Sequence, residues 1–277
     1  MMPFLRSLGS EFQKVLTTRM WWLLAIVLVA YVALLSGGFG AFLGWTLENP
    51  DAAAATGGNA ALPPGVDLAP LLYSFASSIG FVFPVLLGAL SVTSEFRHRT
   101  LTTTFLAEPH RSTVLAGKFT SQLVVGALFG VIGFAASVAT GAAALVAFDL
   151  DTGLDSSDTW ALVGRGVLAM ALWGAIGVGL GSLVPNQVAA IVIVIAFTQF
   201  VEPVLRFAAA LNETTAKVGQ FLPGAASDAL VGASFYSVGG LPTTEALEWW
   251  QGGLVLLGIA VVTTLIGGAT TWRRDVS

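Results

Sequence analysis

The sequence predicts an all-helical integral membrane protein that crosses the bilayer six times. Of its 277 residues, 55% are hydrophobic and only 10% are charged, with a mean hydropathy of +0.83. That leaves too few polar side chains to cover a soluble globule of this size. Apolar runs of about 20 residues also recur, which is the length that crosses about 30 Å of hydrocarbon. The basic residues, finally, gather in alternate connections between these runs.

The chain begins with a predicted amphipathic helix over 1–20. Its apolar residues recur every three or four positions, and its basic residues fall elsewhere on the helical wheel, a pattern typical of a helix lying at a membrane surface. The Trp21-Trp22 pair follows as an interfacial anchor. The first apolar run lacks a small-residue cleavage signature, so we expect it to be retained. The apolar positions are Phe4, Leu5, Leu8, Phe12, Val15 and Leu16, and the basic ones are Arg6, Lys14 and Arg19.

The six predicted spans form a single transmembrane domain over 21–277. A tight Pro185-Asn186 turn separates the fourth span from the fifth. Between the fifth and sixth, 207–250 mixes apolar stretches with Gly and Pro, which favours short or re-entrant helices. The first outer loop, 52–65, is rich in Ala, Gly and Pro, which predicts a flexible connection. The spans are expected at about 21–43, 70–92, 119–148, 160–184, 187–205 and 252–271.

Charge distribution predicts that both termini are cytoplasmic. Nine of the twelve basic residues lie on one side of the predicted spans, and the positive-inside rule makes that side cytoplasmic. The opposite connections are acidic, with Lys217 as their one clearly extramembrane base. The nine are Arg6, Lys14, Arg19, Arg97, Arg99, Arg111, Lys118, Arg273 and Arg274. The acidic residues opposite are Glu48, Asp51, Asp67, Asp149, Asp151, Asp155, Asp158, Glu213, Asp228, Glu245 and Glu248.

Several chemistries are excluded or disfavoured by composition. The chain has no cysteine and only two histidines, so disulfides, thiolate sites and an imidazole metal cluster are not expected. The acidic run at 149–158 lacks the spacing and glycine of an EF-hand, so a solvated loop is favoured over a calcium site. No span carries a paired-carboxylate, His-Glu or Ser-His arrangement, which disfavours an intramembrane enzyme. We therefore expect no catalytic, cofactor or metal residues and no nucleic-acid partner.

The loop after the second span, 94–118, is the strongest candidate for a functional element. It is short, charged, capable of forming a helix and closed by Pro109, so it could transmit force from a soluble partner. The alternative is an ordinary basic loop that only sets topology, and on composition alone that alternative is favoured.

Four stretches of the sequence together resemble the permeases of type 2 ATP-binding-cassette exporters. Each motif is weak alone, but their order and spacing agree with the six-span topology and cover essentially the whole chain. Two positions depart from the pattern: Arg99 stands where the family usually has Gly, and Pro185 where a basic residue often precedes Asn186. The stretches are Glu95, Thr100, Leu106, Pro109, Arg111 and Lys118 in the loop; Glu11–Lys14 with Thr17–Arg19; Gly177–Leu183 with Asn186-Gln187; and Leu222-Pro223-Gly224 followed by Leu230.

The resemblance implies a permease dimer, homomeric or heteromeric, driven by two cytosolic ATPases that bind ATP and Mg. Gly117-Lys118 is followed by Phe119 instead of Ser or Thr, so this chain has no phosphate loop and the motor must be a separate polypeptide. The family's spans one, two and five would face the transport path. Residues implied in ATPase coupling are Glu11, Lys14, Glu95, Arg97, Arg99, Thr100, Pro109 and Arg111, of which Glu95, Arg97, Arg99 and Arg111 would face the motor.

Within the spans, Glu202 and Arg206 are the main functional candidates. They lie four residues apart and could pair as an outer gate or substrate contact, although a salt bridge at the membrane interface is the favoured alternative. Arg165, early in span four, has the same two interpretations. Thr198 and Gln199, with Ser74, Ser77 and Ser78, could line a path, although such hydroxyls more often bond their own helix. Gly177 and Gly181 form a small-xxx-small pair, predicted to pack helices.

Taken together, the sequence predicts the permease subunit of an exporter that moves a hydrophobic or amphipathic molecule, such as a drug, antibiotic, lipopeptide or lipid, out of the cell. A non-transporting scaffold, or an immunity or signalling subunit coupled to an ATPase, is the alternative. Low lysine with abundant Ala, Gly and Val suggests a GC-rich bacterial genome and hence a bacterial plasma membrane.

Overall fold

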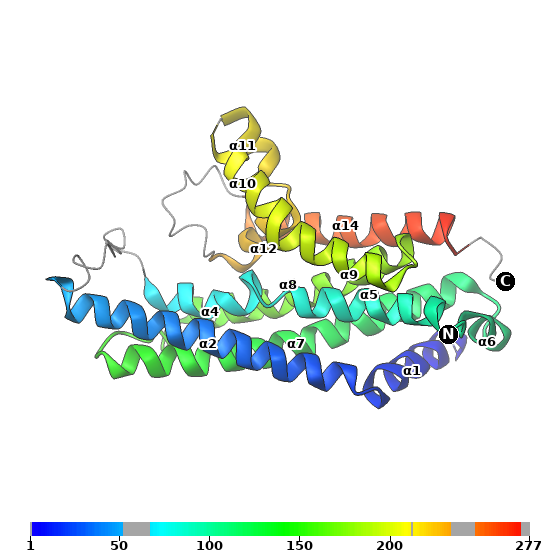
Figure 1. The fold of residues 1–277 in the computed structure, drawn as a ribbon, viewed down its shortest axis with the longest axis horizontal. Helices are drawn as coiled ribbons and strands as arrows, with labels where there is room; N and C mark the ends of the chain where they lie inside the picture. The colour runs from blue at the N-terminus through cyan, green and yellow to red at the C-terminus, as the bar shows by residue number, and fades with distance from the viewer. Residues whose placement is uncertain (1, 52–66, 212, 234–246, 273–277) are drawn as a thin grey trace.

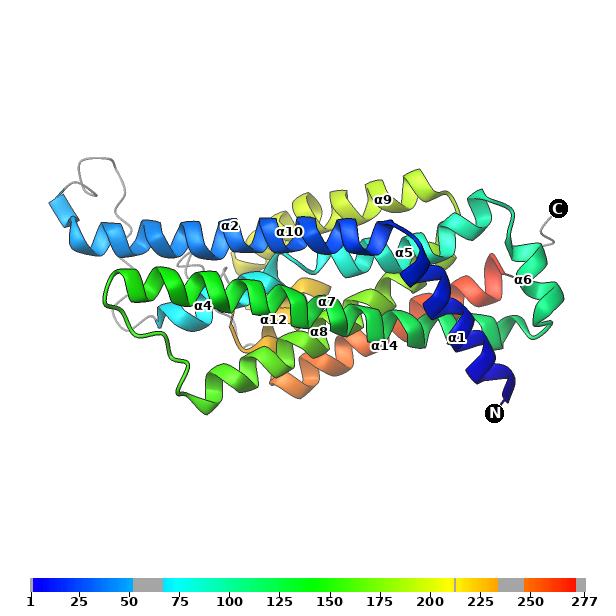
Figure 2. The same cartoon turned by 90° about the horizontal axis from the view of Figure 1, so that it is seen from below.

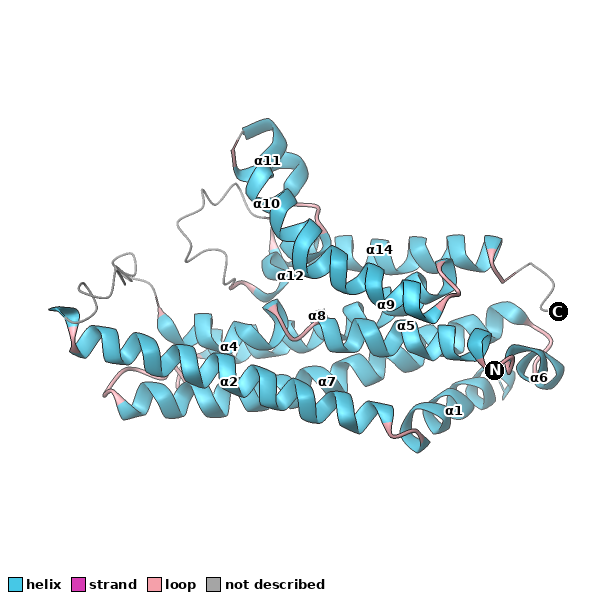
Figure 3. Cartoon of the chain, viewed as in Figure 1, coloured by secondary structure: helices cyan, strands magenta, loops and turns pink. Residues whose placement is uncertain are grey.

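The computed structural model describes residues 2–51, 67–211, 213–233 and 247–272, and every regular element in these ranges is a helix (Figure 3). The 52–65 loop, Arg273, Arg274 and part of the 207–250 connection lie outside the described residues. The helices are α1 (Met2–Thr17), α2 (Met20–Glu48), α4 (Leu68–Ser78), α5 (Val82–Arg97), α6 (Leu101–Ala107), α7 (Arg111–Ala147), α8 (Ser157–Leu183), α9 (Gln187–Ala196), the π-helix η1 (Phe197–Val201), α10 (Glu202–Ala210), α11 (Glu213–Gly219), α12 (Pro223–Val231) and α14 (Trp249–Thr270).

Within the described residues, six helical segments are long and apolar enough to cross a membrane, which confirms the predicted number of candidate spans. The third differs most from expectation, because α7 begins at Arg111, eight residues before the predicted start at 119. These segments are Met20–Glu48, Leu68–Arg97, Arg111–Ala147, Ser157–Leu183, Gln187–Ala209 and Trp249–Thr270.

Helix α8 forms the centre of the bundle, where it packs on α5, α7 and α14 (Figures 1 and 2). Glycine allows the backbones of α8 and α5 to approach closely. A Cβ on Gly177 would lie 2.2 Å from the Val85 carbonyl oxygen of α5. The Cβ of a residue at Gly181 would lie 2.6 Å from the Ala89 carbonyl oxygen. Both glycines of the predicted small-xxx-small pair therefore face α5, and a methyl group at either position would collide with backbone.

Helix α1 packs obliquely against the start of α7 (Figure 2). Its buried row is Ser7, Glu11 and Val15, whereas Leu5 and Leu16 of the predicted apolar face are exposed. Gly117 of α7 makes this contact possible, because a Cβ there would lie 2.7 Å from Ser7 Oγ. The side of α1 that meets the bundle is thus selected by small and ion-paired residues more than by its apolar ones.

Two candidate spans depart from regular α-helix near the middle of the bundle. The second breaks at 79–81 between α4 and α5, where Gly80 precedes Pro84 by four residues. Proline has no N–H, so the Gly80 carbonyl cannot receive the usual helical bond from Pro84. The fifth contains η1, which ends two residues before Pro203, and this proline removes another helical donor. Neither irregularity was predicted from the sequence.

The connection between the fifth and sixth candidate spans contains short helices. α12 packs against α14, α8 and α4, so it belongs to the bundle, whereas α10 and α11 pair with each other and project away from it (Figure 1). The close contact of α12 with α14 depends on Gly252, where a Cβ would lie 2.4 Å from the Ala226 carbonyl oxygen.

Candidate functional site

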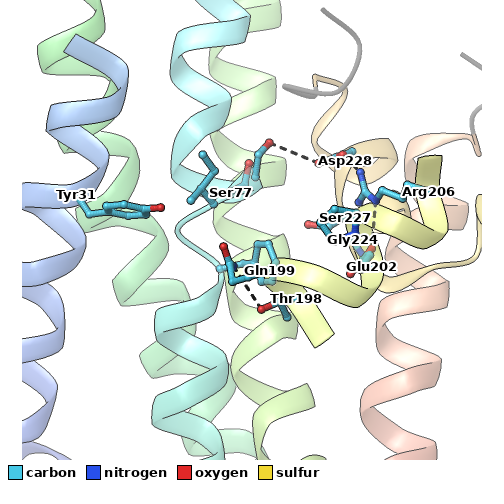
Figure 4. A pocket seen from close by; sticks show the side chains of 13 residues that line it. Tyr31, Ser77, Thr198, Gln199, Glu202, Arg206, Gly224, Ser227 and Asp228 are labelled. Atoms are coloured by element: carbon cyan, nitrogen blue, oxygen red, sulfur yellow. Dashed lines mark hydrogen bonds and ion pairs between the residues drawn. The ribbon is translucent and has the colours of Figure 1, made fainter. Parts of the chain in front are cut away.

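The candidate site is a cavity of about 190 Å³ at the level where the second and fifth candidate spans are irregular (Figure 4). The same helix irregularities therefore shape its walls. The lining residues are Tyr31 from α2; Ser77, Ser78, Ile79 and Phe81 from the break in the second span; Thr198, Gln199, Glu202, Pro203 and Arg206 from η1 and α10; and Gly224, Ser227 and Asp228 from α12.

Glu202 is the most deeply buried charged residue of the cavity wall, with 3% of its surface exposed. Its Oε1 accepts hydrogen bonds from the backbone N–H of Gly224 at 2.5 Å and from Arg206 Nε at 3.2 Å. The Gly224 N–H belongs to the first turn of α12, so the carboxylate also interacts with a helix N-terminus. Its other oxygen, Oε2, is buried without a hydrogen-bond partner.

Arg206 joins Glu202 to Asp228 of α12. Its Nη1 lies 2.6 Å from Asp228 Oδ2, and Ser78 Oγ lies 3.5 Å from Asp228 Oδ1. The sequence placed Asp228 in an outer connection; within that connection α12 folds back onto the bundle, and Asp228 is ion-paired with Arg206 there. Glu202 and Arg206 form the salt bridge that the favoured interpretation predicts, and the Glu202 carboxylate is in addition buried and bound by the Gly224 N–H of α12.

The hydroxyl groups around the cavity bond mainly within their own helices. Thr198 Oγ1 donates to the Val194 carbonyl at 2.8 Å, and Ser77 Oγ donates to the Ser74 carbonyl at 3.0 Å. Gln199 Nε2 lies 3.4 Å from Thr198 Oγ1, and the Gln199 residue is exposed. These groups contribute polar surface to the wall without forming the charged network.

An aromatic pair supports the cavity wall. Phe81 stacks on Trp173 of α8 with ring centroids 4.3 Å apart, and Trp173 Nε1 donates to Ser227 Oγ at 3.1 Å. This contact links the break in the second span to α12 through the central helix. Arg165, the other candidate within the spans, lies apart from this wall, with its guanidinium 5.0 Å from the centre of the Trp249 ring.

A second charged cluster lies at the other end of the bundle, where α1, α5 and α7 meet. Lys118 is completely buried, and its Nζ lies 2.7 Å from Glu11 Oε2 and 2.8 Å from Glu95 Oε1. Lys14 Nζ lies 2.6 Å from Glu11 Oε1 and 2.7 Å from Glu95 Oε1. We call these four residues the closed cluster, because two cations neutralise two carboxylates and the residues are not among those that line the cavity.

The closed cluster changes the expected roles of three residues. Glu95 was expected to face the motor, but Glu95 and Glu11 are buried and bind lysines of the same chain, so neither presents its carboxylate to a partner. Partial burial disfavours the Lys14 ammonium, but the carboxylates of Glu11 and Glu95 outweigh this effect and raise the pKa of Lys14 above its ordinary value of 10.5. All three residues hold helices together.

The loop in which a coupling helix was predicted contains the helix α6, and the charged residues of that loop lie outside α6. α6 itself is uncharged, and Arg97, Arg99 and Thr100 precede it as exposed residues while exposed Pro109 follows it. Leu106 is 79% exposed. Arg99 has a φ of +55°, a left-handed conformation that glycine adopts without strain, at the position where the resembled family usually has glycine.

Arg111 anchors α6 to the end of α14 and is therefore not free to face a motor. Its guanidinium lies 4.9 Å from the centre of the Phe105 ring and donates to the Trp272 carbonyl. Phe105 in turn packs edge-on against Trp272, with ring centroids 5.6 Å apart. Arg97 makes a weaker exposed contact, donating to Gln187 Oε1 at 3.2 Å. The exposed coupling candidates are thus Arg97, Arg99, Thr100 and Pro109.

Sequence reasoning missed Tyr31, Asp228 and the partners of Lys118. Tyr31 lies in an uninterrupted apolar run, and nothing local distinguishes it from the other aromatic residues of α2. Lys118 carried a signal, because a lysine inside an apolar helix requires a buried carboxylate nearby.

No family model matches the chain, and no curated protein matches it significantly.

Proposed function

We propose that this chain is the permease subunit of an ATP-driven exporter, with both termini in the cytoplasm of a bacterial cell, and that the motor is a separate ATPase of the ATP-binding-cassette class. The proposal rests first on the arrangement around α6, a short helix between two candidate spans that exposes Leu106 and is preceded by the exposed Arg97 and Arg99. Arginine is enriched in protein-binding surfaces, so exposed arginines before a short helix suit the docking of a soluble partner.

Contacts behind α6 support a mechanical role. Arg111, Phe105 and Trp272 tie α6 to the end of α14, while the closed cluster ties α1 to α5 and α7. A partner that moves α6 or α1 therefore displaces three candidate spans directly instead of bending a loop. A motor on a separate chain is consistent with Gly117 and Lys118, which lie inside α7 with Lys118 bound by carboxylates and therefore do not form a phosphate loop.

Charge at the two ends of the bundle supports the orientation. The basic residues of α1, α5 and α7 lie with α6 at one end, which the positive-inside rule assigns to the cytoplasm (Figure 1). Glu48, Asp67 and the acidic residues between α7 and α8 lie at helix ends opposite. The cavity would then open toward the outer half of the membrane.

A second permease copy or a paralogue would complete the path. The first and fifth candidate spans bury only 28% and 22% of their most apolar windows within the chain, compared with 78% for α8. These surfaces face lipid or a second permease, and they flank the cavity. A hydrophobic or amphipathic substrate would move along them as the ATPases close and reopen.

The test is affinity purification of the detergent-solubilised chain from its native membrane. We expect an ATPase to co-elute, and the Arg97→Glu/Arg99→Glu variant to recover it about tenfold less because reversed charge at a binding surface opposes association. Lys217→Glu in α11, an exposed charge reversal on the helix pair that projects away from the bundle, is the matched control and should leave recovery unchanged.

An unchanged yield of ATPase in the Arg97→Glu/Arg99→Glu variant would exclude this surface as the coupling site. A chain that purifies without any nucleotide-hydrolysing partner would exclude the exporter and favour the non-transporting scaffold. Coupling without vectorial movement in reconstituted vesicles would favour an immunity or signalling subunit.

A further inference from the structure

The cavity described above has an unbalanced set of charges. Glu202 and Asp228 contribute two carboxylates to its wall, and Arg206 is the one basic side chain among its described lining residues. Buried charges at membrane depth are costly unless they are paired. The wall therefore has the electrostatic requirement of one further positive charge.

One carboxylate oxygen of this wall has no hydrogen-bond partner. Glu202 Oε1 is occupied by Gly224 and Arg206, whereas Oε2 is buried and has no hydrogen-bond partner. Glu95 Oε2 in the closed cluster is likewise unpartnered, but both charges of Lys14 and Lys118 already offset Glu11 and Glu95 there. Among the described residues, only Glu202 both lines the cavity and has a carboxylate oxygen without a hydrogen-bond partner.

The remaining walls suit an organic cation better than a metal ion. Tyr31 extends from α2 on the side of the cavity away from Arg206, and Phe81 adds a second aromatic ring (Figure 4). Aromatic faces attract ammonium groups electrostatically, and more strongly where water is excluded. In the described part of the chain, no group of three His, Asp or Glu residues could hold a metal ion.

The volume of the cavity limits the size of the ligand that can enter it. At about 190 Å³ the cavity is smaller than the roughly 300–1,000 Å³ of sites that enclose a whole small molecule. It can hold a substituted ammonium group and a few attached atoms. Exposed apolar side chains of the adjoining helices, among them Val192 and Phe200, provide a surface for the apolar remainder.

We propose that this cavity binds the ammonium group of a cationic amphipathic molecule, with Glu202 as the principal anionic contact, Asp228 as the second carboxylate and Tyr31 as the aromatic wall. The inference rests on the proposed export function, because it names the substrate class as organic cations. Neutral and anionic amphipaths of the same size should bind more weakly, since they add no positive charge beside the two carboxylates.

Binding can be measured on the full chain in nanodiscs of uncharged lipid, without the ATPase. Three probes share a dansyl fluorophore and a propyl linker and differ in the end group, which is trimethylammonium, hydroxyl or sulfonate. We expect the trimethylammonium probe to bind at least tenfold more tightly than the other two. Empty nanodiscs report partition into lipid and are subtracted.

Two charge variants are expected to change the affinity for the cationic probe in opposite directions. Glu202→Gln should weaken binding of the cationic probe about tenfold and leave the hydroxyl probe unchanged. Arg206→Gln removes the competing cation and should strengthen binding of the cationic probe several-fold, whereas a merely structural role for the network predicts weaker binding in both variants. Glu48→Gln, which removes one exposed carboxylate at the end of α2, is the charge-matched control and should change nothing.

Tyr31 provides a test that does not disturb the buried charges. The ring of Tyr31 packs edge-on against Phe83, with centroids 6.3 Å apart, and the residue is partly exposed, so its replacement should be tolerated. Tyr31→Phe keeps the aromatic face and should retain binding of the cationic probe, while Tyr31→Leu should reduce it about threefold.

Equal affinity of the wild-type chain for all three probes would overturn the inference, and so would an unchanged cation affinity in Glu202→Gln. Either result would leave ATPase co-purification intact and the proposed export function standing. Conversely, loss of the ATPase partner would refute export, and a cation preference removed by Glu202→Gln would still support the binding site.

Discussion

The two charged clusters of this protein contain similar residues but differ in their charge balance. In the closed cluster, Lys118 and Lys14 neutralise Glu11 and Glu95, and the four side chains join three helices. In the cavity, Arg206 bridges Glu202 and Asp228, so one cation serves two carboxylates beside an open volume. Charge balance and packing, more than burial itself, distinguish a structural ion network from a candidate binding site.

Neutralising Lys118 should have the largest effect on stability. Lys118→Met keeps most of the side-chain volume but leaves Glu11 and Glu95 buried with only Lys14, and breaking a buried pair typically costs about 3–5 kcal/mol. Lys14→Met is the comparison, because Lys14 is 41% exposed at its side chain and solvent screens its ion pairs, so its loss should cost less than that of Lys118. Thermal unfolding in detergent measures both, and equal losses would contradict the assignment of Lys118 as the centre of the closed cluster.

A methyl group added where α1 meets α7 tests whether the closed cluster depends on the close approach of these two helices. A Cβ on Gly117 would lie 2.7 Å from Ser7 Oγ, so Gly117→Ala should push α1 outward and destabilise the protein by about 1–3 kcal/mol, the usual cost of overpacking.

Gly9→Ala is the matched control on α1. It meets nothing within 4 Å and should be neutral or stabilise the helix by up to about 1 kcal/mol. Proteolysis within 1–20 would report the release of α1, and a Gly117→Ala variant as resistant as Gly9→Ala would show that this contact does not hold the helix.

In the cavity, a similar methyl group should alter binding more than stability. A Cβ on Gly224 would lie 2.4 Å from Glu202 Oε1 and 2.5 Å from Arg206 Nη2, and both atoms are at the ends of side chains that can shift. Gly224→Ala should therefore reduce affinity for the trimethylammonium probe several-fold while shifting the free energy of unfolding by about 1 kcal/mol. A large loss of stability with normal probe affinity would mean that Glu202 serves as a structural cap for α12.

The smallest expected effect is the pH dependence contributed by Lys14. Its pKa is raised in the folded state, so its stabilising contribution is complete below the unfolded value of about 10.5 and is lost as pH rises through the folded pKa. Lys14→Arg keeps its charge throughout that range and should lose less stability above pH 10.5 than the wild type. Unfolding temperatures measured across this window should diverge, and superimposed curves would contradict the assignment.

The network residues differ in how far local sequence could reveal them. Glu202 and Arg206 were identified because a charge inside an apolar run is conspicuous and their four-residue spacing allows pairing. Asp228 was assigned to a loop because its neighbours alternate between apolar residues and breakers, and only the return of α12 onto α4, α8 and α14 brings it to Arg206. Glu95 was assigned to a surface for the same reason, since the partner that buries it lies in α7, beyond α6.

The sequence by itself determined the number of candidate spans, the short helices that follow the fifth and the ends at which charge gathers, because hydrophobic length and charge position are local properties. Only the tertiary structure decided which charges became buried, where the second and fifth spans deviate, and that these deviations meet at one cavity. Those features depend on backbone contacts between distant segments, which glycine permits and which local pattern does not encode.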